Sequence, residues 1–199
     1  MFKKLGFIGC GNMATAIING AVSSGFVNGE NVFVFDVDNA KTSALKEKYG
    51  LNICESAESV AQSTDVTVLA IKPQVFPTVL PQIKDSVKEN NTAIVSIGAG
   101  KTLEYIGSFL SDDTAIVRVM PNINAKVGAS MSGVCKNGNA TSELLEYVKK
   151  LCQSFGNVIE LDESMFPLFG VIAGCSPAYA FMFIDSMVRE AVKNGMKKE

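Results

Sequence analysis

The stretch Lys4-Leu5-Gly6-Phe7-Ile8-Gly9-Cys10-Gly11-Asn12-Met13-Ala14 decides the fold. An apolar run ends at two glycines and residues at helical spacing follow, so the stretch predicts a strand, a tight turn and a helix. Its spacing is G-x-G-x-x-A, in which Gly9 permits the reversal, Gly11 leaves room for a pyrophosphate, and Ala14 lets the helix pack closely on the strand. The N–H groups at such a helix start bind phosphates. The pattern favours dinucleotide binding over an ordinary glycine-rich turn.

The composition of the 199 residues describes a globular chain with no strong charge. A net charge of −2 provides no basic field for nucleic acid or for an anionic membrane surface. The chain has no histidine, which removes the commonest metal ligand and the commonest acid–base group. The five cysteines include no C-x-x-C pair, so they argue against a disulfide framework or a zinc site and fit a reducing cytoplasm. We therefore expect a cytoplasmic protein that binds neither metal nor nucleic acid.

Two segments resemble membrane signals. Residues 1–4 carry two lysines before an apolar run, but glycines and Asn12 interrupt that run. Residues 164–184 carry no charge and are long enough to span a bilayer. The residues expected to break this segment into two short pieces are Pro167, Gly170, Gly174, Ser176 and Pro177. We expect a buried or subunit-facing pair of helices, with Tyr179 as a buried aromatic residue, in a soluble protein with no membrane partner.

Strands and helices alternate through most of the chain. Strands are predicted around residues 31–38, 51–54, 65–71, 92–97, 115–120, 128–135 and 157–162. Helices are predicted at residues 13–24, 39–49, 56–62, 77–88, 102–110 and 141–155. This alternation predicts an α/β fold, a Rossmann-type doubly wound and mostly parallel sheet over residues 1–162. Residues 163–199 have no strand pattern and are predicted to be helical, so a domain boundary is expected near Asp162.

Two polar residues lie where strands of such a sheet end, which is the edge where ligands bind. Asp36 ends the second strand, near the acid that the fingerprint places about twenty residues beyond its glycines. A carboxylate there binds the ribose hydroxyls of NAD and repels the 2′-phosphate of NADP. The alternative for Asp36 or Asp38 is to cap the next helix. Lys72 precedes Pro73 and either contacts phosphate or ribose or is an ordinary solvated lysine.

Four blocks of sequence resemble the pyrroline-5-carboxylate reductase family, in that family's order. They are residues 6–14, Ala70-Ile71-Lys72-Pro73-Gln74, Arg118-Val119-Met120-Pro121-Asn122 and Gly174-Cys175-Ser176-Pro177-Ala178-Tyr179, and Ser96-Ile97-Gly98-Ala99-Gly100 also fits. The first block is shared with other Rossmann enzymes, whereas the lysine-proline and methionine-proline-asparagine blocks together are specific. The resemblance covers the whole chain. It implies hydride transfer from NADH or NADPH to the C=N bond of 1-pyrroline-5-carboxylate, which gives L-proline.

The resemblance also implies which residues form the site. Those expected to bind the coenzyme are Ile8, Gly9, Gly11, Asn12 and Met13, then Asp36, Ala70, Lys72 and Pro73, then Ala99 and Gly100, and finally Met120, Pro121 and Asn122 beside the nicotinamide. Cys175 and Ser176 are expected on the substrate side, where the family usually has serine and glycine. No catalytic acid is assigned, because a protonated cyclic imine accepts hydride directly once the two rings are positioned.

The departures from the family leave alternatives open. In the family a helical domain continues past the last block, holds the substrate carboxylate and forms a dimer, whereas this sequence ends at Glu199. A homodimer or higher homo-oligomer is implied by the resemblance. The alternative hypothesis is a truncated, non-catalytic nucleotide-binding module. A third hypothesis is a relative of the 3-hydroxyacid dehydrogenases, which use a lysine of the second domain as the catalytic acid. Here Lys193, Lys197 and Lys198 fit a solvated helix end instead.

Coenzyme preference is a further open point. Val37 stands where members that prefer NADP often have an arginine, and together with Asp36 it favours NADH. Lys41 is nevertheless placed to meet a 2′-phosphate. Ile123 and Asn124 also differ from the threonine and proline that usually follow the methionine-proline-asparagine block.

Overall fold

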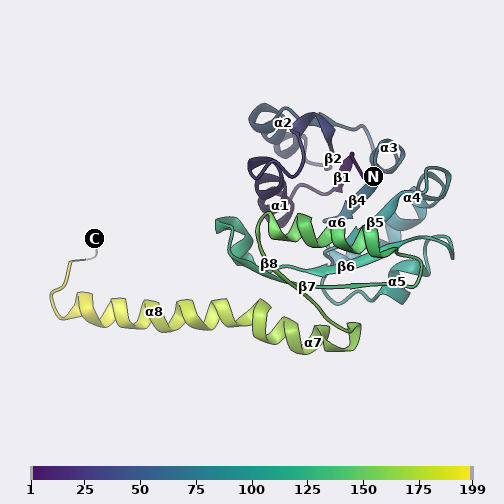
Figure 1. Cartoon of the computed structure of the whole chain (residues 1–199). Helices are drawn as coiled ribbons and strands as arrows, with labels where there is room; N and C mark the ends of the chain where they lie inside the picture. The colour runs from purple at the N-terminus through teal and green to yellow at the C-terminus, as the bar shows by residue number, and fades with distance from the viewer. Residues whose placement is uncertain (1, 198–199) are drawn as a thin grey trace.

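An eight-stranded sheet forms the centre of the protein, and the computed structural model describes residues 2–197 (Figure 1). The strands lie in the order β3-β2-β1-β4-β5-β6-β7-β8. All neighbours are parallel except β6 and β7, which are antiparallel. The first six strands have the Rossmann order, in which the direction of winding reverses between β1 and β4. The predicted doubly wound, mostly parallel sheet is confirmed.

The helices and strands lie close to the predicted positions. The strands are β1 Leu5–Ile8, β2 Val32–Phe35, β3 Asn52–Ile53, β4 Val66–Leu69, β5 Ala93–Ser96, β6 Ile116–Met120, β7 Ser130–Lys136 and β8 Gly156–Glu160. The helices are α1 Asn12–Ser23, α2 Asn39–Tyr49, α3 Ala57–Ser63, α4 Phe76–Glu89, α5 Leu103–Gly107, α6 Ser142–Gln153, α7 Phe166–Phe169 and α8 Ser176–Lys193. Short hydroxyl side chains cap several helices; Ser56, for example, accepts a hydrogen bond from the N–H of Ser59 at 3.1 Å.

Helices cover both faces of the sheet. Side chains of α1, α2 and α6 form one hydrophobic core against the sheet, and those of α3, α4 and α5 form the other. Successive strand residues point to opposite faces, so Phe7 lies in the first core and its neighbour Ile8 in the second. Burial on both faces explains why the central strands read as continuous apolar runs.

The segment after Asp162 differs from its prediction. It is one continuous helical arm, Glu163–Lys193, made of a short 3-10 turn, α7, a π-helical stretch over Gly170–Cys175, and α8. Pro177 does not break it, because the wider π-helical turn that precedes the proline relieves the clash of its ring with the preceding turn. A pattern of prolines and glycines alone does not reveal such a turn, and the prediction of two short pieces is wrong.

The helical arm is also more exposed than predicted. Figure 1 shows α8 projecting past the edge of the sheet, and none of the residues of α8 is buried. Tyr179, predicted to be buried, is 63% exposed. Among residues 2–197 the arm is the one helix long and apolar enough to cross a membrane, which by itself is weak evidence for a span. Burial of this segment within a single copy is therefore not observed, and its alternative, a subunit-facing segment, stays a prediction. Lys198 and Glu199 lie outside the described residues, and the boundary at Asp162 stays a prediction.

One partly buried ion pair attaches the start of the helical arm to the sheet. The guanidinium of Arg118, buried on β6, donates to Glu163 Oε1 at 2.9 Å. The same oxygen accepts the N–H of Leu103, the first residue of α5, at 2.8 Å. The guanidinium also lies 4.4 Å from the ring centroid of Phe166, which is fully buried. One carboxylate oxygen thus joins β6, α5 and the arm.

We expect Glu163→Ala to destabilise the protein strongly, because it leaves the buried Arg118 charge without its anion. The free energy of unfolding should fall by about 2–3 kcal/mol, somewhat less than for a fully enclosed pair, since the Glu163 side chain is partly exposed. Urea unfolding followed by circular dichroism measures this change.

Glu160→Ala is the matched control. Glu160 pairs with Lys149 at 2.7 Å on the surface, where loss of an ion pair costs less than about 1 kcal/mol. An equal decrease in the free energy of unfolding for Glu163→Ala and Glu160→Ala would contradict the role given to the Arg118–Glu163 pair.

Candidate coenzyme-binding site

The turn between β1 and α1 has the geometry that its glycines predict. Gly9 has a φ of +97°, and a Cβ added there would lie 2.6 Å from the carbonyl oxygen of Ala70, so only glycine fits. Gly11 has an ordinary φ of −71°, and its Cβ position faces open space. The first glycine is therefore required by the fold. The second leaves open a space beside the start of α1.

The turn lies at the carboxyl ends of the parallel strands, where the winding of the sheet reverses between β1 and β4. The N–H of Gly9 donates to the carbonyl of Phe35 on β2 at 2.7 Å, and the N–H of Ala70 after β4 donates to the carbonyl of Ile8 at 2.8 Å. Both neighbouring strands thus hold the turn in place at the edge where open α/β sheets bind ligands.

The two acids after β2 have different roles. Asp38 caps α2 by accepting the N–H of Ala40 at 3.1 Å. The ammonium of Lys41 and, secondly, this hydrogen bond lower the pKa of the Asp38 carboxyl group. Asp36 instead accepts the N–H of Cys10 at 2.7 Å and the N–H of Asp38 at 2.9 Å. The carboxylate of Asp36 therefore supports the glycine turn from the end of β2.

A cavity of about 290 Å³ opens beside Asp36. It is bounded by the glycine turn on one side and by the end of β4 on the other, and Lys41 and Lys72 contribute their side chains to its wall. The ammonium of Lys41 lies 3.9 Å from Asp36 and 3.3 Å from Asp38. This cavity has the position and the charged groups expected for the adenosine ribose.

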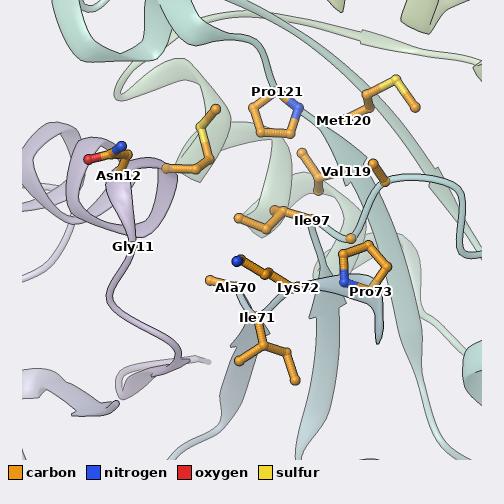
Figure 2. A pocket seen from close by; sticks show the side chains of 13 residues that line it. Gly11, Asn12, Ala70, Ile71, Lys72, Pro73, Ile97, Val119, Met120 and Pro121 are labelled. Atoms are coloured by element: carbon orange, nitrogen blue, oxygen red, sulfur yellow. The ribbon is translucent and has the colours of Figure 1, made fainter. Parts of the chain in front are cut away.

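A second cavity, of about 340 Å³, adjoins the first, and Lys72 lines both (Figure 2 shows the residues of the second). It is formed where α1 begins and where β4, β5 and β6 end. Of the side chains that line it, only Asn12 and Lys72 are polar. An apolar cavity with few polar groups, next to a helix start, suits a flat organic ring attached to a phosphate.

The structure brings most of the predicted coenzyme residues to these two cavities. The larger cavity is lined by Gly11, Asn12, Met13, Ala70, Lys72, Pro73, Ala99, Met120 and Pro121. Ile8, Gly9 and Asp36 line the smaller one, together with Gly11, Ala70 and Lys72. Gly100 lines neither of the two. Ile71, Ile97, Gly98 and Val119 also line the larger cavity without having been predicted. Their position at the ends of adjacent parallel strands is the signal that identifies them.

Asn122 and the predicted substrate residues lie further along the same edge. A third cavity, of about 320 Å³, contains Asn12, Met13, Pro121, Asn122 and Gly174 in its wall. Cys175 and Ser176 follow Gly174 directly but line none of these three cavities. The side chain of Asn122 is buried and donates to the carbonyl of Ala173 in the arm at 2.9 Å.

Cys10 lies inside the glycine turn but is not a reactive thiol. Burial, and secondly the negative charge of Asp36, raise the pKa of Cys10 to about 12. The thiol therefore keeps its proton near neutral pH, and a protonated thiol is a poor nucleophile. Cys10 serves as a small buried side chain in the turn.

Comparisons with known proteins identify the family of the chain. Residues 4–100 match a family model described as NADP oxidoreductase, coenzyme F420-dependent, and residues 163–199 match one described as pyrroline-5-carboxylate reductase dimerisation. Pyrroline-5-carboxylate reductase of Escherichia coli K12 is 41% identical over 199 residues, which are 100% of this chain and 73% of that protein.

Two solved structures are also similar over nearly the whole chain. The pyrroline-5-carboxylate reductase of Coxiella burnetii superimposes with a TM-score of 0.92 at 28% identity, covering 98% of this chain and 73% of that one. The Plasmodium falciparum pyrroline carboxylate reductase, solved with NADP bound, gives a TM-score of 0.88 at 31% identity, covering 98% and 71%. The chain therefore belongs to the pyrroline-5-carboxylate reductase family, whose members are NAD(P)H-dependent oxidoreductases.

Proposed function

We propose that this protein transfers a hydride from a nicotinamide coenzyme to the C=N bond of 1-pyrroline-5-carboxylate and so forms L-proline. The observation that carries the proposal is the apolar cavity at the ends of β4, β5 and β6, which continues from the glycine turn. The membership of the chain in a family of reductases with this name supports it.

The residues of the glycine turn fit the pyrophosphate of the coenzyme. The open space at the Cβ position of Gly11 is the room that a phosphate needs beside the main chain, and any larger residue would fill it. The free N–H groups and the dipole of α1 favour a negative charge there. Lys72, whose side chain lines both cavities, is placed to contact a phosphate or a ribose hydroxyl.

The coenzyme, when bound, supplies the hydride, and the chain supplies position and a dry environment. Met13, Ile97 and Val119 offer apolar contacts to the nicotinamide ring and exclude water from it. The imine accepts hydride in its protonated form, so the protein is asked to hold two rings together rather than to activate a nucleophile. Cys175 and Ser176 are proposed on the substrate side, next to Gly174.

We infer that the coenzyme is NADH in preference to NADPH. The carboxylate of Asp36 lies in the wall of the adenosine-side cavity, where it attracts ribose hydroxyls and repels a 2′-phosphate. Lys41 offsets part of this repulsion, but its ammonium is already within 4 Å of both Asp36 and Asp38. No arginine follows Asp36, since the next residue is Val37.

We propose that a second copy of the chain covers the helical arm and that the protein is a cytoplasmic homodimer or a larger homo-oligomer. The arm exposes large apolar side chains, among them Phe181, Phe183, Ile184 and Met187, and such a surface on a soluble monomer is unusual. The match of residues 163–199 to a dimerisation model favours a protein partner over a bilayer.

The purified protein should oxidise NADH only when 1-pyrroline-5-carboxylate is present, and NADPH more slowly. Asp36→Ser should raise the kcat/KM for NADPH relative to that for NADH by about tenfold or more, because a repulsion worth ~1.4 kcal/mol is removed. Absorbance at 340 nm follows both reactions, and proline formation is measured in the same samples.

If the wild type and Asp36→Ser both prefer NADPH to the same degree, the role of Asp36 in coenzyme choice is contradicted. Coenzyme binding without any imine-dependent turnover would contradict the reductase and favour the alternative hypothesis, a non-catalytic nucleotide-binding module. The Lys150→Ala variant, at an exposed residue of α6 that lines neither cavity, is the control and should keep the coenzyme ratio of the wild type.

Light scattering should give a particle of at least twice the 21.2 kDa mass of one chain. Phe183→Asp should dissociate it, because a charge in the apolar interface loses its hydration without gaining a partner. Val127→Asp, at an exposed valine outside the arm, should leave the mass unchanged. A wild-type chain that is monodisperse at 21.2 kDa would contradict the proposed dimer.

A further inference from the structure

The helical arm contains a carbonyl group that its own helix is poorly able to satisfy. In an α-helix the carbonyl of residue 173 accepts the N–H of residue 177. Residue 177 is a proline, which has no N–H. Ala173 lies in the π-helical stretch directly before α8, where bonds run to residue i+5, so the donor that is missing at this junction is the α-type one of residue 177. The structure supplies this carbonyl with a donor from outside the arm.

That donor is the side chain of Asn122. Its Nδ2 donates to the carbonyl oxygen of Ala173 at 2.9 Å. The carboxamide is held by its other end, because Oδ1 accepts the N–H of Asn124 at 3.2 Å, and the main-chain N–H of Asn122 donates to the hydroxyl of Ser130 at 3.2 Å. The residue is only 6% exposed. Asn122 is therefore a fixed donor at the end of β6.

This hydrogen bond lies beside the coenzyme cavity. Pro121, the residue before Asn122, lines the apolar cavity, and Gly174, the residue after Ala173, lines the adjoining cavity with Asn12 and Met13. Past this point α8 buries none of its residues. The position of residues 174–176 relative to the glycine turn thus depends on a contact at Ala173.

The other attachments of the arm lie nearer its beginning. Glu163 is held by Arg118, and Phe166 is fully buried beneath that guanidinium. Loss of the Asn122 side chain would leave these contacts in place. It would release the π-helical stretch and the start of α8 without detaching the arm.

We propose that Asn122 is a positioning residue that replaces the N–H missing from Pro177 and thereby holds Gly174 in the wall of the cavity that adjoins the coenzyme cavity, and residues 175–176 directly after it. Its effect on the substrate rests on the proposed function, in which these residues lie on the substrate side. The hydrogen bond and its effect on the arm do not depend on that function.

A double-mutant cycle with Pro177→Ala tests the proposal, because alanine restores a main-chain N–H at position 177. Hydrogen–deuterium exchange of peptides covering residues 170–180 is measured on the full chain, together with KM for 1-pyrroline-5-carboxylate and the Kd of NADH. Asn122→Ala should raise both the exchange rate and KM about tenfold, the effect of one lost hydrogen bond to a buried group. Asn122→Ala/Pro177→Ala should return both values to within about threefold of the wild type.

Two further variants separate the donor from other effects. Asn122→Asp keeps the acceptor for Asn124 but loses the N–H donor when ionised, so it should behave like Asn122→Ala. Asn139→Ala removes a side chain that donates to the carbonyls of Asp112 and Thr114 and should leave exchange at residues 170–180 unchanged.

The proposal is overturned if Asn122→Ala leaves exchange unchanged or if Pro177→Ala fails to rescue it. It is also overturned if Asn122→Ala raises the Kd of NADH as much as it raises KM and Pro177→Ala does not restore that Kd. Asn122 would then contact the coenzyme directly. If Pro177→Ala restores the exchange rate but the protein never reduces the imine, the positioning role of Asn122 is supported and only the proposed function is contradicted.

Discussion

The conformation of Gly9 is the constraint on which the site depends. Its positive φ and its approach to the carbonyl of Ala70 admit no side chain, so the chain reverses at this point and the N–H groups at the start of α1 face the open edge of the sheet. Asp36, from the end of β2, holds the next N–H, that of Cys10. Three adjacent strands, β2, β1 and β4, therefore determine one turn, and the two cavities beside it follow from the sheet order.

Strand β6 connects this site to the helical arm. Arg118, within the strand, binds Glu163 at the beginning of the arm, and Asn122, just after the strand, binds Ala173 at the π-helical stretch. Met120 lies between them and lines the apolar cavity. Its sulfur also lies close to the arm, 3.3 Å from the position that a Cβ on Gly170 would take. A change in the direction of the arm would thus displace residues that line the proposed nicotinamide side of the site, because only a few short contacts separate the two. The exposed remainder of the arm is available for a second copy.

The sequence was enough to predict the sheet and the turn. Strands and helices differ in the period of their apolar residues, and the tight turn requires a glycine at position 9 for a local steric reason. It did not separate Asp36 from Asp38, since both follow the same strand and only the fold decides which one meets Cys10 and which caps α2. The Arg118–Glu163 pair escaped prediction because its residues lie 45 positions apart and an arginine in an apolar strand carries no sign of its partner. The continuity of the arm was missed because a π-helical turn has no clear residue pattern.

The central claim is that the open space at Gly11 receives the pyrophosphate of the coenzyme. Calorimetric titration of NADH into Gly11→Ala tests it most directly, because the backbone at Gly11 accepts alanine and the new methyl group meets no protein atom. Gly138→Ala, whose Cβ also faces open space, is the matched control. We expect that only Gly11→Ala weakens NADH binding, by about tenfold or ~1.4 kcal/mol, with its melting temperature unchanged. Equal affinities for both variants and the wild type would contradict it.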